Sequence, residues 1–231
     1  MLFVTGTGTG VGKTWFSVAL IEAWLAQGHS VLAVKPFETG CDPDPLDAIA
    51  LARACRMPHL VSLEGLYRAR LPVAPWAATK AGEPAPDLDA IALRVDELRG
   101  THVAVPRQTL PEIERVTVPD NRPQRVLVEG AGGPLVPLTA ELDIADWAVG
   151  KFDSVVLVAA DQLGVQSHTF TAVESLEKRG LPLKAVVLNT TEDSDPSQSS
   201  NRDILAERLD VPVVRMAWKS RVVPPEIVAL A

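Results

Sequence analysis

The sequence predicts an α/β fold built on a doubly wound, mostly parallel sheet. Short apolar runs rich in β-branched residues alternate with segments whose apolar residues recur at helical spacing. The strongest run, residues 154–160, is nearly all apolar, which is typical of a parallel strand covered on both faces. A glycine-rich stretch, residues 6–12, separates the first strand-like run from the first helix-like segment. The length of 231 residues favours one large domain over residues 1–231.

The expected elements follow one another in strand–helix order. Gly28 follows the first helical pattern as a stop signal, and Asp87 suits the N-cap of a later helix. Strands are expected at residues 2–5, 30–35, 125–129, 154–160, 185–189 and 211–215. Helices are expected at residues 13–26, 46–55, 87–98, 167–179 and 202–209. We expect loop and short turns over residues 71–86, a surface loop over residues 191–201, and no assignable element over residues 100–124.

Composition excludes several classes of protein. The net charge is −7 and Lys and Arg do not cluster, so no nucleic-acid partner is predicted. The N-terminus lacks the features of a signal peptide, and no apolar run is long enough to span a bilayer. A cytoplasmic protein without a membrane partner is therefore expected. Cys41 and Cys55 show no metal-ligand spacing and are expected to be reduced thiols.

Residues 6–14, with the sequence GTGTGVGKT, predict a phosphate-binding loop and hence a fold of the P-loop NTPase type. Glycines let backbone N–H groups turn toward phosphates, and the helix N-terminus adds partial positive charge. Lys13 would place a full charge at the β- and γ-phosphates, and the Thr14 hydroxyl suits Mg²⁺. The strict pattern requires glycine where Thr7 stands, so a glycine-rich turn that binds nothing is the alternative. The predicted nucleotide-binding residues here are Gly10, Val11, Gly12, Lys13, Thr14 and Trp15.

Several segments, taken in chain order, resemble the dethiobiotin synthetase family. The loop has the family layout Gly-Thr-x-Thr-x-Val-Gly-Lys-Thr, and the most specific segment is VEGAGG at residues 128–133. The resemblance runs from Leu2 to about Trp218 and is weakest over residues 100–124. The other matching segments are residues 34–40, residues 47–51, residues 145–147, Leu163-Gly164 with His168, and Asn189.

The resemblance implies an ATP- and Mg²⁺-dependent ligase of biotin biosynthesis. In that family, one amine of 7,8-diaminopelargonic acid captures CO₂ as a carbamate. The carbamate attacks the γ-phosphate of ATP to give a carbamic–phosphoric anhydride, and the second amine displaces phosphate to close a ureido ring. The family also implies a homodimer in which the long substrate spans both subunits.

The residues suit this chemistry. Lys13 and Lys35 would form a cationic clamp on the phosphoryl group. Hard oxygen ligands for Mg²⁺ would come from Thr14, Asp47 and Glu129. By resemblance, Thr9 and Thr39 would contact the carbamate or the diamine. The substrate carboxylate would bind the backbone of Gly164, Val165, Gln166 and Ser167 at a helix start. The remaining nucleotide-binding residues are Gly130, Ala131, Gly132, Asn189, Met216, Ala217 and Trp218.

Alternatives stay open at several positions. Lys35 suits a surface lysine, Asp47 an acid in the first turn of a helix, and Asn189 a turn cap. Where the family loop carries acidic residues, this chain has Gly8 and Gly10, which leaves the preference among ATP, CTP and GTP open. A partition-type ATPase switch would carry lysine at position 8. An amidating synthetase would need a glutamine-hydrolysing domain with a nucleophilic cysteine. A nucleotide-binding module without turnover is the third alternative.

Overall fold

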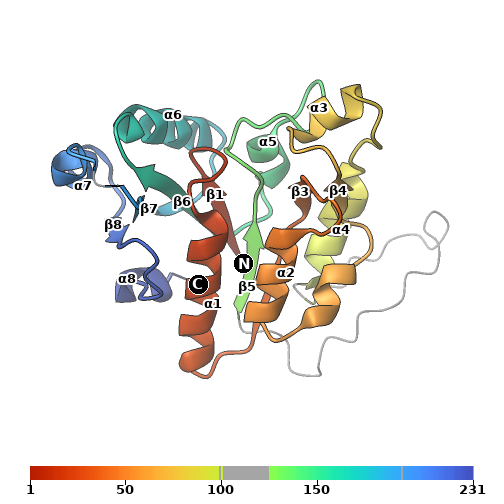
Figure 1. The fold of residues 1–231 in the computed structure, drawn as a ribbon, viewed down its shortest axis with the longest axis horizontal. Helices are drawn as coiled ribbons and strands as arrows, with labels where there is room; N and C mark the ends of the chain where they lie inside the picture. The colour runs from red at the N-terminus through yellow and green to blue at the C-terminus, as the bar shows by residue number, and fades with distance from the viewer. Residues whose placement is uncertain (99, 101–124, 194, 231) are drawn as a thin grey trace.

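In the computed structural model, six parallel strands form the central sheet in the order β2-β5-β1-β6-β7-β8 (Figure 1). The structure describes residues 1–98, 100, 125–193 and 195–230. The strands are β1 (Leu2–Gly6), β2 (Val31–Val34), β5 (Arg125–Glu129), β6 (Ser154–Asp161), β7 (Leu183–Thr190) and β8 (Val213–Met216), and β3 (Phe37–Thr39) pairs with β4 (Tyr67–Ala69) in a second, parallel sheet. The helices are α1 (Lys13–Ala26), α2 (Leu46–Ala54), η1 (Pro58–Ser62), α3 (Pro75–Lys80), α4 (Leu88–Leu98), α5 (Ile144–Ala148), α6 (Val165–Lys178), α7 (Gln198–Arg208) and α8 (Pro225–Val228). The predicted doubly wound α/β fold is confirmed.

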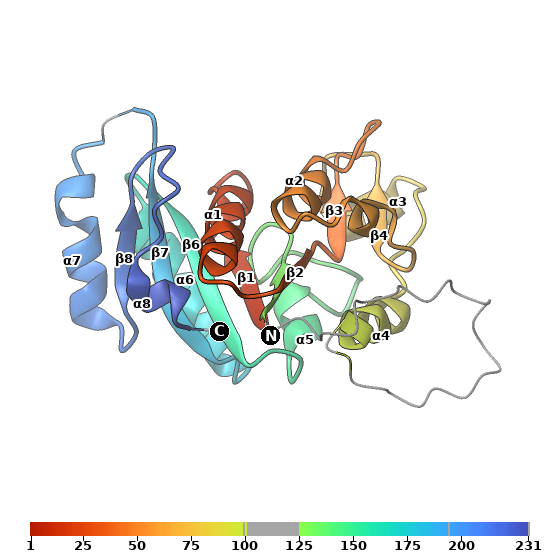
Figure 2. The ribbon, with the colours of Figure 1, turned by 90° about the horizontal axis from the view of Figure 1, so that it is seen from below.

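Helices cover both faces of the central sheet (Figure 2). Alternate side chains of β1 point to opposite faces, as in any strand. Leu2 and Val4 pack with α1, α2 and α8, whereas Phe3 packs in a second cluster with α4 and α5. A third cluster joins β6 and β7 to α6 and α7. Burial on both faces explains why these strands are continuous apolar runs.

The strand order places the glycine-rich loop at a change of direction in the sheet. After β1 the chain moves outward to β2, whereas β6, β7 and β8 follow on the other side of β1. Ligands of open α/β sheets bind at such a point, beyond the carboxyl ends of the strands. Here those ends bring together residues 6–14, Lys35, Glu129 and Asn189.

Some predicted boundaries are wrong. The helix expected from residue 167 begins at Val165, directly after Gly164, whose φ of +92° suits glycine. The predicted loop over residues 191–201 overlaps α7, which begins at Gln198 and not at residue 202. Helix α3 lies within the segment expected as loop and turns, because Pro75 at its first position starts a helix as readily as a turn. Apart from Gly100, residues 100–124 lie outside the described residues. Among the helices described, none is both long enough and apolar enough to cross a membrane.

Candidate nucleotide and substrate site

The loop over residues 6–14 joins β1 to α1 as predicted. Helix α1 begins at Lys13, and Gly12 at its N-cap has a φ of +87°, a conformation that disfavours residues with a Cβ. The first turn of α1 carries no acidic residue. No carboxylate from that turn therefore offsets the partial positive charge of the helix N-terminus beside the loop. The loop therefore has the backbone geometry of an anion-binding site.

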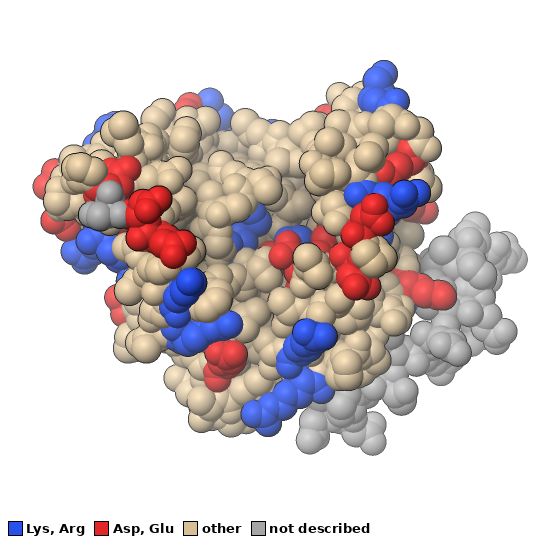
Figure 3. Space-filling view, in the orientation of Figure 1, with Lys and Arg blue, Asp and Glu red and all other residues tan. Residues whose placement is uncertain are grey.

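A cavity of about 370 Å³ lies against this loop. In the space-filling view, basic and acidic groups meet in the hollow near the centre of this face (Figure 3). The residues that line the cavity come from three parts of the chain, namely the loop, the β2–α2 region and the segment after β5. They are Thr9, Gly10, Gly12, Lys13, Thr14, Trp15, Lys35, Glu38, Thr39, Asp47, Ala131 and Gly132.

Lys35, directly after β2, is the centre of an ion-pair cluster in this cavity. Its Nζ lies 2.7 Å from Oε1 of Glu129 and 2.7 Å from Oδ2 of Asp47, and 3.4 Å from the carbonyl oxygen of Gly130. The Lys35 side chain is buried, which alone would lower its pKa. The two carboxylates outweigh burial and raise the pKa of Lys35 to about 12. The ammonium is therefore charged at neutral pH and is not a surface lysine.

Two carboxylates contact this ammonium, and the Thr14 hydroxyl contacts one of them. Thr14 Oγ1 donates to Oε1 of Glu129 at 2.7 Å, and Asp47 stands in the first turn of α2. Burial would raise the pKa of Asp47, but Lys35 outweighs it and holds that pKa below its ordinary value. Glu129 is fully buried, and its Oε2 has no hydrogen-bond partner among the described residues. An unpartnered buried carboxylate oxygen beside a second carboxylate and a hydroxyl suits a hard cation.

Lys13 lies in the same cluster. Its Nζ donates to the carbonyl oxygen of Gly8 at 2.8 Å, so the ammonium stays within the loop. Burial, together with the charge of Lys35, lowers the pKa of Lys13 to about 8, against the opposing effect of Glu129 and Asp47. Two ammonium groups thus face one cavity, an arrangement that favours a multiply charged anion between them.

Asn189 joins the end of β7 to the phosphate loop. Its Nδ2 donates to the carbonyl oxygens of Val11 and Gly12, and its buried Oδ1 accepts no hydrogen bond from the part of the chain that the structure describes. Met216 is paired with Asn189 across the sheet, but its side chain lies in the core, so only its backbone faces this region. Ala217 and Trp218 follow it, and the Trp15 indole holds this segment by donating to the carbonyl oxygen of Ser220 at 2.7 Å.

The other predicted substrate residues fall in two places. Thr9 and Thr39 line the cavity with Ala131 and Gly132. The segment Gly164–Ser167 is not among its lining residues; it forms the start of α6, where the Gln166 side chain donates to Oδ1 of Asn201 at 3.1 Å.

Sequence reasoning does not identify Glu38, which also lines the cavity. Its buried carboxylate accepts hydrogen bonds from two backbone N–H groups at the start of α2. Burial raises the pKa of Glu38, partly offset by these hydrogen bonds and by Lys35 and Arg68. Glu38 lies within residues 34–40, a segment that resembles the family, but nothing in the sequence indicates which groups its carboxylate would contact.

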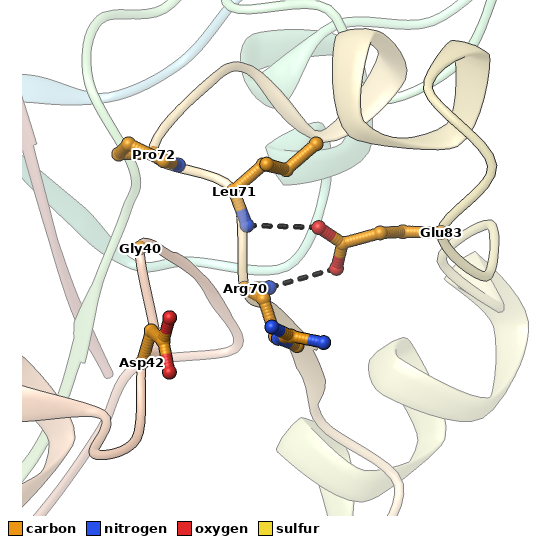
Figure 4. A pocket seen from close by; sticks show the side chains of 6 residues that line it. All are labelled: Gly40, Asp42, Arg70, Leu71, Pro72 and Glu83. Carbon is orange, nitrogen blue, oxygen red and sulfur yellow. Dashed lines mark hydrogen bonds between the residues drawn. The ribbon is translucent and has the colours of Figure 1, made fainter.

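A second cavity, of about 500 Å³, opens beside Gly40 (Figure 4). Its other lining residues are Asp42, Arg70, Leu71, Pro72 and Glu83. The Glu83 carboxylate accepts hydrogen bonds from the backbone N–H groups of Arg70 and Leu71, at 2.7 and 2.8 Å. None of these described lining residues is a lysine or belongs to the phosphate loop.

The chain resembles known proteins in sequence and in fold. The family model described as AAA domain matches residues 1–216. The chain is 38% identical over 202 residues to the ATP-dependent dethiobiotin synthetase BioD of Anaeromyxobacter sp. strain Fw109-5, covering 87% of this chain and 81% of the relative. It is 38% identical over 196 residues to the protein of the same name from Caulobacter vibrioides, covering 84% and 81% of the two chains.

Among solved structures, the septum site-determining protein MinD of Pyrococcus horikoshii, complexed with Mg-ADP, matches with a TM-score of 0.50 and 18% identity. That match covers 93% of this chain and 81% of the other. The MinC:MinD cell division complex of Aquifex aeolicus matches with a TM-score of 0.52 and 15% identity, covering 92% and 79%. At this identity the likeness shows the fold alone.

Proposed function

The chain belongs to the dethiobiotin synthetase family and is an ATP-dependent ligase of biotin biosynthesis, and on this premise we propose that it makes dethiobiotin from 7,8-diaminopelargonic acid, CO₂ and ATP at the Lys13–Lys35 cavity. The observation that carries the proposal is the position of the Lys35 ammonium. It lies 2.7 Å from both Glu129 and Asp47, in a cavity that the phosphate loop also lines.

The proposed reaction has three steps. An amine nitrogen of the diamine bonds to the carbon of CO₂ and loses a proton, giving a carbamate. A carbamate oxygen then bonds to the γ-phosphorus, and the bond from that phosphorus to the bridging oxygen of ADP breaks. Finally the second amine nitrogen bonds to the carbamoyl carbon, inorganic phosphate leaves, and a second proton is lost. The products are dethiobiotin, ADP and phosphate.

The described side chains supply what these steps need. Negative charge accumulates as carbamate meets phosphate, and Lys13 and Lys35 offset it from fixed positions on one cavity. The loop N–H groups hold the phosphates. Thr9 and Thr39 place hydroxyl groups on the same cavity wall, where they would orient the carbamate or the free amine.

Mg²⁺ is part of the proposal because the oxygen set fits it. Thr14, Asp47 and Glu129 would hold it, and the unpartnered Oε2 of Glu129 is the observation in favour. Bound there, Mg²⁺ would neutralise phosphate charge. Within the described residues no cluster of three or more His, Cys, Asp or Glu could hold a metal ion. A site completed by phosphate oxygens and water is the usual arrangement for Mg²⁺.

The proposal is tested by measuring ADP release from purified protein with each reactant omitted in turn. We expect ADP only when diamine, CO₂, ATP and Mg²⁺ are all present, with dethiobiotin formed in equal amount. The proposed homodimer would appear as a dimer mass in light scattering. ATP hydrolysis that is equally fast without the diamine would reject the synthetase reaction and favour a partition-type switch.

A further inference from the structure

The N-terminus of α2 receives its hydrogen-bond acceptor from another element. A helix begins with N–H groups that lack partners, and a Ser, Thr, Asp or Asn at the N-cap usually accepts from them. In α2 the N-cap is Pro45, which makes no side-chain hydrogen bond to the helix. Glu38 of β3 supplies the acceptor instead. Its Oε1 accepts from Asp47 N at 2.7 Å and its Oε2 from Ala48 N at 3.0 Å.

This cap acts on the residue that faces the phosphate loop. Asp47 carries one of the two N–H groups held by Glu38, and its own carboxylate lies 2.7 Å from Lys35 Nζ. Lys35 in turn contacts Glu129, which accepts from Thr14. The Asp47 side chain is partly exposed, so packing alone does not fix it. Glu38 thus holds the backbone of the residue whose carboxylate pairs with Lys35.

Glu38 is itself held rigidly. It is 5% exposed and belongs to the short β3–β4 sheet, whose Phe37 packs in the core on the other face. Arg68 of β4 donates from Nη1 to the carbonyl oxygen of Lys35, which ties the same sheet to the chain beside the cluster. The second sheet thus provides a fixed reference for the start of α2.

We propose that Glu38 is a positioning residue that sets Asp47 in the place where it completes the Mg²⁺–nucleotide site. This inference rests on the proposed function only for the identity of that site. It assigns no contact between Glu38 and the metal or the nucleotide. Residues one step removed from a metal ligand commonly change metal affinity about 10- to 100-fold when they are replaced.

A matched control exists in the same part of the fold. Glu83 accepts two successive backbone N–H groups, those of Arg70 and Leu71, with nearly the same distances, but it lies beside the second cavity and not the phosphate loop (Figure 4). Replacing either glutamate removes two hydrogen bonds of one kind. Only the Glu38 change acts on Asp47.

The experiment is calorimetric titration of ATP, with and without Mg²⁺, into wild type, Glu38→Ala, Glu38→Gln and Glu83→Ala. We expect the gain in ATP affinity from Mg²⁺ to fall about tenfold or more in Glu38→Ala. The fall should be smaller in Glu38→Gln, whose amide oxygen still accepts one N–H. In Glu83→Ala the gain should stay within about twofold of wild type, since distant sites act independently. Affinity for metal-free ATP should be unchanged in Glu83→Ala, because Glu83 does not line the nucleotide cavity.

Thermal unfolding of the same samples distinguishes an effect of Glu38 on the position of Asp47 from an effect on the stability of the fold alone. If Glu38→Ala and Glu38→Gln lower the unfolding temperature but keep the wild-type gain from Mg²⁺, the proposal is wrong. If Glu38→Ala does not fold, Glu38→Gln alone decides between the same two outcomes. No diamine is needed, so a failure of the ring-closure proposal in the ADP assay leaves this result intact.

Discussion

The side-chain nitrogen of Asn189 lies 3.2 Å from the carbonyl oxygen of Gly12, to which it donates a hydrogen bond. A second bond, of 3.0 Å, goes to the carbonyl oxygen of Val11. Both amide hydrogens are thus used, which fixes the orientation of the side chain and leaves Oδ1 as a buried acceptor. The end of β7 is therefore locked to the phosphate loop and offers one acceptor beside it.

This orientation predicts a preference for bases that carry an amino group. Adenine and cytosine present an exocyclic donor where guanine and uracil present a carbonyl oxygen. A buried acceptor left unpaired costs about 1–3 kcal/mol, so ATP and CTP should bind about tenfold or more tightly than GTP and UTP. Competition titrations measure this, with Asn189→Ala as the variant that should lose the discrimination. GTP binding as tight as ATP binding would contradict the prediction.

Replacement of Lys35 by methionine should nearly abolish turnover while ATP still binds. The substitution keeps the apolar stem but removes the charge beside Glu129 and Asp47. Loss of one electrostatic contact to a developing charge typically lowers kcat about 100- to 1000-fold. Steady-state ADP release would measure it, with far-UV circular dichroism to verify folding. Lys178→Met is the control, because Lys178 is exposed and pairs with exposed Glu174. A Lys35→Met enzyme with wild-type kcat would contradict the proposed role.

Lys13 should make the ligand-free protein less stable at neutral pH than above pH 8. Its pKa in the folded chain is about 8, against an ordinary value of 10.5. Between these values the unfolded chain holds more protons at this site, so the contribution of Lys13 to stability rises with pH. Below pH 8 the cost of burying the charge is present in full. Lys13→Met should therefore unfold at higher urea than wild type at pH 7, with a smaller difference at pH 9.5. A difference that stays constant between these two pH values would show that the Lys13 charge is not its cause.

Nucleotide binding should have the opposite effect on the protonation of Lys13. Phosphates favour the charged form of Lys13, so binding above pH 8 should take up a proton. Calorimetry at pH 8.5 in two buffers of different ionisation enthalpy would show this uptake. Equal heats in both buffers would contradict the assigned pKa, and ATP affinity should fall as pH rises above 8.

The sequence predicts those strands whose burial requires a continuous run of apolar residues. Strands β5 and β6 are short runs of mostly apolar residues, and their predicted starts agree with the structure. Strands β3 and β4 escape prediction because each has only three residues and a charged residue, Glu38 or Arg68, at its centre. A strand this short shows no periodicity that distinguishes it from a loop.

The site likewise has a part that the sequence predicts and a part that it does not. Lys13, Lys35 and Glu129 each stand at or just after the carboxyl end of a strand or at the helix that follows, so a parallel sheet brings them to one edge. Their convergence is predictable from order along the chain. The cap on α2 is not, because the acceptor comes from β3, whereas the sequence suggests a local start signal in Asp44 followed by Pro45.

An ion pair between buried Asp161 and partly exposed Arg215 predicts a loss of stability on truncation. Asp161 ends β6, is fully buried, and accepts from Arg215 Nε at 2.7 Å and Asn201 Nδ2 at 2.9 Å. Arg215→Ala would leave this buried carboxylate without its positive partner. Because Arg215 is partly exposed, we expect a cost of about 1–3 kcal/mol, as for a buried acceptor left unsatisfied. Urea unfolding measures the change. Lys178→Ala should leave stability nearly unchanged, since its pair with Glu174 is exposed. Equal effects from the two substitutions would show that Asp161 does not depend on Arg215 for its charge balance.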